Sequence, residues 1–191
     1  MNSPSERVQL VFDTTLGPMH LAASPHGLAG AWFAGQRHAP AQLDGPHAWP
    51  LAPEHALLLQ ARDELQAYLQ GRLRVFSVPL DLSCGTPFQQ AVWQALLHIP
   101  CGQLQGYGAL AAQLGRPAAA RAVGAAVGRN PVSVIVPCHR VVGADGSLTG
   151  YAGGLERKQA LLRLEGVAQR ERHERYELSA SQSPLWPEVT A

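Results

Sequence analysis

The run of residues 130–142, Asn-Pro-Val-Ser-Val-Ile-Val-Pro-Cys-His-Arg-Val-Val, constrains this chain more than any other stretch. Its β-branched residues, 132–136, predict a short buried strand, because valine and isoleucine favour pleated, buried positions. Pro137 has no N–H to donate to a sheet, so the strand is expected to end there. Cys138 would then lie at the end of the strand, followed in sequence by the imidazole of His139 and the guanidinium of Arg140.

This position favours a reactive thiol at Cys138. An ordinary cysteine has a pKa of about 8.5, so only a few per cent of it is thiolate at neutral pH. A nearby cation, or a base reached through water, raises that fraction. Lowering the pKa by about two units corresponds to roughly 2.7 kcal/mol of thiolate stabilisation. The alternative interpretation is an inert core thiol, which is the commoner state of a free cysteine.

Charge is distributed unevenly along the chain. Residues 1–83 carry five basic and seven acidic side chains, whereas residues 84–166 carry seven basic and three acidic ones. A basic second half attached to an acidic first half favours a polyanionic partner for the second half. The chain has 191 residues, of which 46% are hydrophobic and 15% charged, enough for one large or two small globular domains.

The cysteines indicate a reducing compartment. There are three of them, Cys84, Cys101 and Cys138, and their spacing matches no disulfide framework. No cysteine precedes Cys84, so a zinc site with thiolate ligands is not expected in the first half. No stretch is typical of a signal peptide or of a membrane span, so we expect a cytoplasmic protein without a membrane partner.

The first domain, expected over residues 1–83, is a small α/β unit. Short apolar runs over 8–13, 19–23 and 28–33, separated by turn residues, predict an antiparallel meander of three strands. A helix is predicted over 54–70, where Leu58, Ala61, Leu65 and Leu69 recur at helical spacing.

The second domain is expected over residues 84–168. Thr86 and Gln89 form a capping box that begins a helix, with Pro87 at its first position. Helices over 107–114 and 118–127, joined by a turn with Gly115, predict a helix-turn-helix. A last helix is predicted over 155–164. The tail, 169–191, is expected to begin as a helical end and to continue as disordered chain.

The helix over 118–127 consists almost entirely of small residues, and Arg121 is its one long side chain. Alanine favours helices and permits close packing, which is sufficient reason for such a composition. A helix without bulk can also enter a narrow groove of DNA and insert one side chain there. Both interpretations remain open from these residues alone.

The ordered set Asn130-Pro131, Pro137 to Arg140 and Gly150 to Gly154 resembles the active-site signature of the O6-alkylguanine-DNA alkyltransferases, also called methylated-DNA–protein-cysteine methyltransferases. The resemblance runs from about Thr86 to Glu165, and more loosely over the first half. It implies a ribonuclease H-like α/β N-terminal domain of antiparallel strands plus a helix. A mostly α domain with a winged-helix-like helix-turn-helix would follow.

The resemblance implies DNA repair by a single-turnover enzyme. The alkyl group of O6-alkylguanine, and of the related O4-alkylthymine, would pass irreversibly to Cys138 after the base is flipped out from the minor groove. The implied partner is double-stranded DNA carrying alkylated guanine. No cofactor and no metal are implied. The protein would be a monomer in solution, with cooperative assembly on DNA left open.

The resemblance also implies residue roles. Cys138 would be the nucleophile, His139 would take its proton through a water molecule, and Glu165 would orient His139. Tyr107 would protonate the departing guanine, and Asn130 would support the active-site turn. Independently, a carboxylate at a helix C-terminus is unfavourable with the helix dipole, so Glu165 is expected to have a specific partner.

Two further sets of residues follow from the resemblance. Arg121 would intercalate where the target base has left, and the residues expected beside it on DNA are Ala120, Ala122, Gly124, Arg129 and Tyr107. The expected base pocket consists of Val141, Tyr151, Ala152 and Lys158. Gly106 precedes Tyr107 where many members of the family have serine or threonine, so this chain lacks that hydroxyl.

Three other functions fit parts of the sequence. A non-catalytic lesion binder of the alkyltransferase-like kind would lack Cys138. A helix-turn-helix regulator that senses electrophiles needs polar base-reading side chains, which the helix over 118–127 almost lacks. A cysteine hydrolase would use Cys138 and His139, whose direct contact is awkward if both lie on one strand. If the strand ends at Pro137, this constraint relaxes and a base bridged by water becomes possible.

Overall fold

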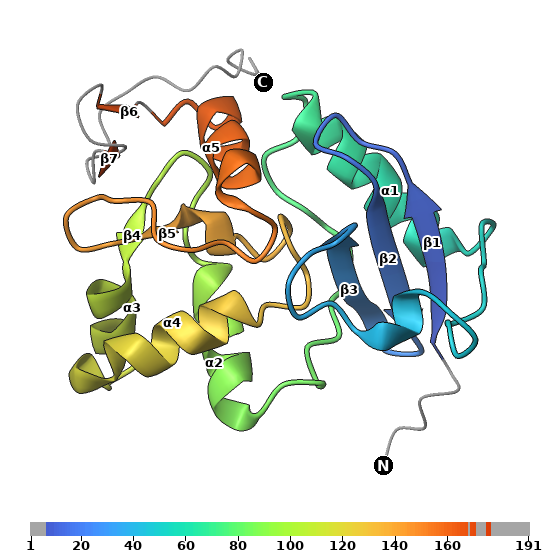
Figure 1. Cartoon of the computed structure of the whole chain (residues 1–191), viewed down its shortest axis with the longest axis horizontal. Helices are drawn as coiled ribbons and strands as arrows, with labels where there is room; N and C mark the ends of the chain where they lie inside the picture. The colour runs from blue at the N-terminus through green and yellow to red at the C-terminus, as the bar shows by residue number, and fades with distance from the viewer. Residues whose placement is uncertain (1–6, 168, 171–174, 177–191) are drawn as a thin grey trace.

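The computed structural model describes residues 7–167, 169–170 and 175–176. Figure 1 shows two halves side by side, a sheet with one covering helix in blue to teal and a group of helices in green to orange. This arrangement agrees with the expected fold class. The expected tail lies outside the described residues except for two short strands, β6 (Gln169–Arg170) and β7 (Arg175–Tyr176). These strands pair antiparallel, so the predicted helical end is wrong.

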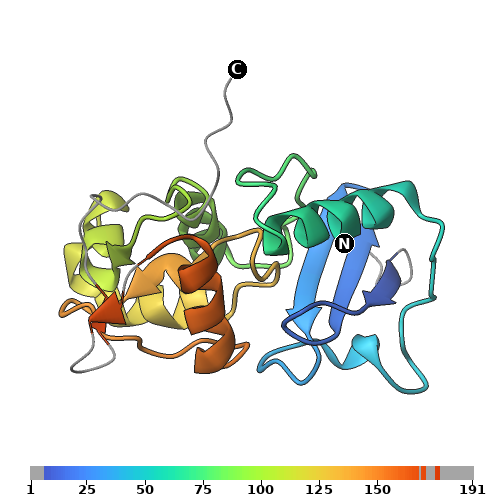
Figure 2. The ribbon, with the colours of Figure 1, turned by 90° about the horizontal axis from the view of Figure 1, so that it is seen from above.

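The N-terminal half is the predicted meander. Strands β1 (Val8–Phe12), β2 (Met19–Ser24) and β3 (Gly27–Phe33) form an antiparallel sheet in the order β1-β2-β3. Leu10 pairs with Leu21, and Leu21 with Ala31, so alternating positions supply a continuous apolar face. Helix α1 (Ala56–Leu69) covers this sheet, as Figure 2 shows from above. A short 3₁₀ helix, η2 (Ala41–Leu43), lies in the loop between β3 and α1.

The buried face of α1 differs by one residue from its prediction. Leu58, Ala61 and Leu65 are fully buried as expected, but Tyr68 rather than Leu69 completes the row. Residues spaced by three and four positions share one face of a helix, and Tyr68 follows Leu65 by three. The helix therefore ends by burying an aromatic ring with a polar tip.

The C-terminal half begins with α2 (Pro87–Leu96), and the predicted capping box is formed there. The Gln89 N–H donates to Thr86 Oγ1 at 3.3 Å, and the Thr86 N–H donates to Gln89 Oε1 at 2.9 Å. Trp93 of α2 donates through its indole N–H to the carbonyl of Ala126 at 2.9 Å. This bond ties α2 to the helix of small residues.

The predicted helix-turn-helix is present. Helix α3 (Tyr107–Gln113) is followed by a turn at Gly115, whose φ is +70°, by the 3₁₀ helix η3 (Pro117–Ala119) and by α4 (Ala120–Gly128). A short parallel pair, β4 (Gln105–Gly106) with β5 (Val141–Val142), lies beside it, and α5 (Leu155–Leu164) follows.

The predicted strand over 132–136 is wrong. The chain instead forms a compact turn in which the Val136 N–H donates to the Val132 carbonyl at 2.9 Å, and Val134 has a φ of +74°. The Cys138 N–H donates to the Val136 carbonyl at 2.8 Å across Pro137, whose φ of −81° and ψ of 59° define an inverse γ-turn. The turn ends in a 3₁₀ helix, η4 (Cys138–Arg140).

This turn pairs with the sheet of the other half. The Ala31 N–H of β3 donates to the Pro131 carbonyl at 2.9 Å, and the Ser133 N–H donates to the Ala31 carbonyl at 2.8 Å. One hydrophobic cluster also runs through both halves, from Leu10 in β1 to Leu161 in α5. The N-terminal sheet thus supports the turn that carries Cys138. No helix among the described residues is both long and apolar enough to cross a membrane.

Candidate active site

Cys138 begins η4 with 5% of its surface exposed. Its sulfur accepts a hydrogen bond from the side-chain amide of Asn130, with 3.0 Å between Nδ2 and Sγ. Burial raises the pKa of Cys138, and the Asn130 hydrogen bond and the charge of Lys158 only partly oppose this effect. The net direction is opposite to the one expected from the sequence. In this state Cys138 rests as a thiol and needs a base.

Asn130 organises the turn around the thiol. Its Oδ1 accepts the N–H of Val132 at 3.0 Å, and its Nδ2 donates to the Val136 carbonyl at 2.8 Å. Nδ2 also donates to the Val132 carbonyl at 3.3 Å and to the sulfur of Cys138. A buried amide that bonds both ends of a turn fixes its shape. This accounts for a left-handed valine at 134, a conformation that β-branched residues rarely adopt.

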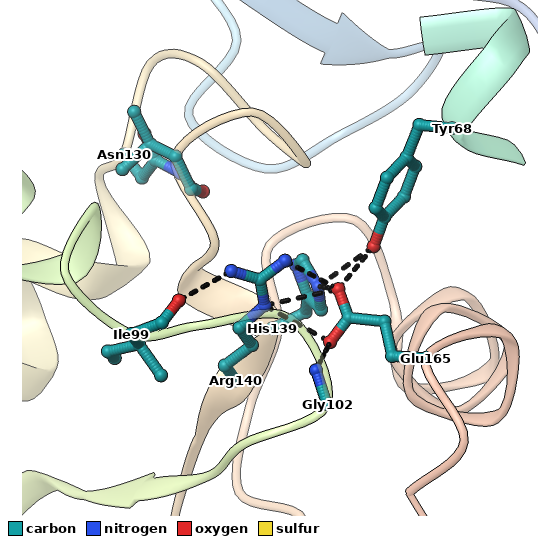
Figure 3. A network of polar contacts seen from close by, with 8 residues as sticks. Tyr68, Ile99, Gly102, Asn130, His139, Arg140 and Glu165 are labelled. Carbon is teal, nitrogen blue, oxygen red and sulfur yellow. Dashed lines mark hydrogen bonds and ion pairs between the residues drawn. The ribbon is translucent and has the colours of Figure 1, made fainter. Parts of the chain in front are cut away.

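His139 and Glu165 meet in a fully buried ion network (Figure 3). His139 Nε2 lies 3.0 Å from Glu165 Oε1. Burial lowers the pKa of His139, and the negative charge of Glu165 opposes that shift. Although burial also disfavours a carboxylate, the charges and hydrogen bonds of His139 and Arg140 hold the pKa of Glu165 far below its usual range. Glu165 thus has the specific partner expected for it, and His139 is neutral at pH 7.

The position of Arg140 in the sequence suggested that its guanidinium lies beside the Cys138 thiol, but its hydrogen bonds are made elsewhere. Its guanidinium donates to Glu165 Oε1 through Nη2 at 2.7 Å and to the Ile99 carbonyl through Nη1 at 2.6 Å. The Gly102 N–H donates to Glu165 Oε2 at 3.2 Å. Arg140 therefore neutralises the carboxylate rather than activating Cys138.

Tyr68 belongs to this network and was missed from the sequence. Its Oη lies 2.5 Å from Glu165 Oε1 and 3.4 Å from His139 Nε2. In Figure 3 it reaches the carboxylate from α1, whereas the other labelled residues come from the C-terminal half. Its spacing from Leu65 signalled burial, but no local pattern indicates a partner 97 positions away along the chain.

Tyr107 begins α3 and is half-buried. Its ring lies against α4 at Gly124, where a Cβ would be 3.6 Å from the ring carbons. Burial raises the pKa of Tyr107, the hydrogen bond with Thr149 opposes this, and the charge of Cys138 adds to it. The phenol therefore keeps its proton at neutral pH, as a proton donor must.

Lys158 is fully buried and joins two segments near the thiol. Its Nζ donates to the Val141 carbonyl at 2.6 Å and to the Thr149 carbonyl at 3.0 Å. Burial lowers the pKa of Lys158 to about 8. Of the other expected pocket residues, Tyr151 is buried and its pKa is raised well above the ordinary value by burial and then by the charge of Cys138. The Ala152 carbonyl accepts the N–H of Arg37 at 3.1 Å.

The expected DNA-binding residues other than Tyr107 lie on α4 or at its ends. Arg121, Ala122 and Arg129 are exposed on α4 or at its end, while Ala120 and Gly124 are half-buried. The opposite face of α4 buries Val123, Ala126 and Val127 in the core. Within the described part of the chain, no group of three or more His, Cys, Asp or Glu side chains is placed to hold a metal ion.

Two family models match the chain. Residues 8–82 match the 6-O-methylguanine DNA methyltransferase, ribonuclease-like domain, and residues 87–167 match the 6-O-methylguanine DNA methyltransferase, DNA binding domain. The chain is 48% identical to a Mycobacterium leprae protein named methylated-DNA–protein-cysteine methyltransferase, over 80% of this chain and 88% of that one. It is 43% identical to a protein of the same name from Methanosarcina acetivorans, over 82% of this chain and 96% of that one.

Solved structures give the same result. The crystal structure of Mycobacterium tuberculosis OGT in complex with DNA is similar with a TM-score of 0.77 and 47% identity, over 83% of this chain and 93% of that one. The O6-methylguanine-DNA methyltransferase from Pyrococcus kodakaraensis is similar with a TM-score of 0.60 and 26% identity, over 84% of this chain and 99% of that one. Its sequence, its fold and the surroundings of Cys138 place this chain in the 6-O-methylguanine DNA methyltransferase family.

Proposed function

We propose that this protein repairs DNA by transferring the alkyl group of O6-alkylguanine directly and irreversibly to Cys138. The observation that carries this proposal is the placement of a buried thiol in a turn held by Asn130, in a chain of this family. The acceptor is a side chain, so each molecule reacts once and no cofactor is needed. O4-alkylthymine, whose oxygen carries the same kind of substituent, is a second expected substrate.

The reaction is a substitution at carbon. The Cys138 sulfur attacks the alkyl carbon, a C–S bond forms, and the bond between that carbon and O6 of guanine breaks. The thiol proton passes to His139 through a water molecule, and Tyr107 gives its proton to the departing guanine. The proton on His139 then returns to Tyr107 through solvent, so the products are a thioether and unmodified guanine.

The protonation states described above support these roles. His139 is neutral, so it can accept a proton, and the ionised Glu165 stabilises the imidazolium that forms. Tyr107 keeps its proton until guanine leaves, and a neutral purine leaves more readily than an anion. Because burial raises the pKa of Cys138, the thiolate forms only as His139 takes its proton.

Alkylated double-stranded DNA is the proposed partner, and the relative from Mycobacterium tuberculosis has been crystallised in complex with DNA. The exposed face of α4 carries small residues and Arg121, which suits entry into the minor groove. Arg121 would fill the place of the flipped base, since O6 cannot be reached inside the stack. Ala120, Ala122, Gly124 and Arg129 would lie along the groove.

The rival functions have less support. A cysteine hydrolase needs the imidazole against the thiol, whereas Cys138 Sγ accepts from Asn130 and His139 Nε2 faces Glu165. A sequence-specific regulator needs polar side chains along α4, whose exposed face offers Arg121 and alanines.

Intact mass spectrometry after mixing with a duplex that carries one O6-methylguanine tests the proposal. We expect the protein to gain one methyl group, located on the Cys138 peptide. Cys138→Ser should gain none, while Cys84→Ser, a matched control at an exposed cysteine, should gain one. Binding of the duplex without a change in mass would show a lesion binder and refute alkyl transfer.

A further inference from the structure

Tyr68 connects the N-terminal half to the proposed proton relay. It lies in the last turn of α1, is fully buried, and directs its hydroxyl at Glu165 Oε1 from 2.5 Å. Burial raises the pKa of Tyr68 well above its ordinary value, and the negative charge of Glu165 adds to the shift. The phenol is therefore protonated, and its O–H donates to the ionised carboxylate.

The contacts of Glu165 determine which nitrogen of His139 carries the proton. Oε1 and Oε2 accept hydrogen bonds from Tyr68, from Arg140 and from the Gly102 N–H, so the carboxylate acts only as an acceptor. His139 Nε2 must then be the nitrogen that donates to it. This leaves the lone pair on Nδ1, a buried atom without a hydrogen-bond partner among the described residues.

We propose that Tyr68 is a positioning residue for alkyl transfer: its hydroxyl holds Glu165 Oε1 so that His139 keeps its proton on Nε2 and its basic lone pair on Nδ1. This inference rests on the function proposed above. It extends the reactive machinery into the N-terminal half, which contains none of the site residues expected from the sequence. Arg140 and Gly102 approach Glu165 from the C-terminal half, and Tyr68 approaches from the other half.

The network contains few other charged or titratable groups. His139 and Arg140 come from η4, Lys158 of α5 acts on His139 through its charge, and Cys101 lies in the loop after α2. Burial, with the charge of Glu165, raises the pKa of Cys101 to about 11, so this thiol stays neutral. A change in the titration of His139 after removal of the Tyr68 hydroxyl therefore reports on the pair of Glu165 and His139, both of which that hydroxyl contacts.

Tyr68→Phe removes the hydroxyl and keeps the ring, which packs on Phe76 with 5.2 Å between ring centroids. We expect alkylation of Cys138 to slow by roughly tenfold, the order expected for losing a hydrogen bond to a charged group. Free O6-benzylguanine and an alkylated duplex should be affected by the same factor, because the hydroxyl touches neither. The acid limb of the pH–rate profile should move to higher pH, because Glu165 with one donor fewer attracts the imidazolium proton more strongly.

A matched control is Phe76→Leu, which alters the packing of the same ring and leaves the hydroxyl. It should lower thermal stability without moving the acid limb. NMR titration of the His139 imidazole in wild-type protein and Tyr68→Phe adds a readout independent of alkyl transfer. A wild-type protein that does not react refutes the proposed function, whereas an identical His139 titration in the two proteins overturns the role of Tyr68.

A double-mutant cycle with Glu165→Gln separates positioning from structure. If Tyr68 acts through the carboxylate, Tyr68→Phe should have no further effect on rate once Glu165 carries no charge. Additive losses in the double variant would mean that Tyr68 contributes only to packing, and the inference would be wrong.

Discussion

The carboxylate of Glu165 shows how one buried charge can organise a site. Its hydrogen-bond partners Tyr68, His139, Arg140 and the Gly102 N–H all act as donors. A buried charge is tolerated only when it is paired and hydrogen-bonded, and here both conditions are met. The ion pair with Arg140 leaves the network close to neutral, so His139 need not be charged at rest.

This arrangement makes stability depend on pH in a defined window. The pKa of His139 in the folded protein is below its ordinary value of 6.5, so the unfolded chain binds more protons just below that pH. The contribution of His139 to the free energy of unfolding should therefore be complete above about pH 6.5. Below that pH the free energy of unfolding should decrease by up to about 1.4 kcal/mol per pH unit. Urea unfolding at several values between about pH 7 and pH 5 measures this slope.

His139→Gln is the control, because its amide keeps an N–H that can donate to Glu165. In this variant the slope between about pH 6.5 and pH 5 should flatten. Loss attributable to Glu165 begins only below its ordinary value of 4.5, since its folded pKa is depressed. An equal slope in both proteins would mean that another group causes the loss.

At the scale of the element, α4 buries one face in the core and exposes the other, which is the proposed DNA-binding face. Val123, Ala126 and Val127 are buried, while Arg121 projects from the exposed face. Arg121→Ala should slow repair of an alkylated duplex by roughly 5- to 150-fold, corresponding to about 1–3 kcal/mol. Its reaction with free O6-benzylguanine should stay unchanged, because the thiol and its base are untouched. Rates of Cys138 alkylation measured with both substrates test whether Arg121 acts on the duplex alone.

Arg62→Ala is a suitable control, because Arg62 pairs with Asp63 on α1 in the other half. It should leave repair of the duplex intact. Equal loss on both substrates in Arg121→Ala would contradict intercalation and point to a folding defect.

Elements with local signals were predicted well. The capping box of Thr86 and Gln89 depends on residues three apart, and both of its hydrogen bonds are present. The prediction of a strand over 132–136 was wrong because β-branched residues favour strands but do not reveal where a turn forms. The side chain of Asn130 and the γ-turn at Pro137 override that propensity. The resemblance that assigns the nucleophile role to Cys138 does not depend on that strand, and this role stays a prediction.

At the scale of the whole molecule, one hydrophobic core joins the two halves. It includes Leu21 of β2 and Leu65 of α1 as well as Val92 of α2 and Leu161 of α5. We expect heat to unfold the protein in a single cooperative transition, with equal calorimetric and van't Hoff enthalpies. Two separated calorimetric peaks would mean that the halves are independent domains, as the boundary expected near residue 83 implies.

The contact between Tyr68 and Glu165 joins the two halves of the molecule, and it could not be predicted from the sequence. Its partner Glu165 lies in the other half, and only tertiary packing brings them together. The sequence predicted that Glu165 needs a partner, because a carboxylate at a helix C-terminus is unfavourable. It did not identify the partner, since helical periodicity reports a buried face and not what that face meets.

Pairing of the turn over 131–133 with Ala31 has a consequence for solubility. Exposed strand edges recruit strands from other molecules, and proteins avoid aggregation by covering them. Here β1 is covered at Gln9 by residues 50–52, and β3 is covered at Ala31 by the turn that carries the reactive cysteine. Any event that displaces this turn would uncover a strand edge. Damage to the active site would thereby expose a surface prone to self-association.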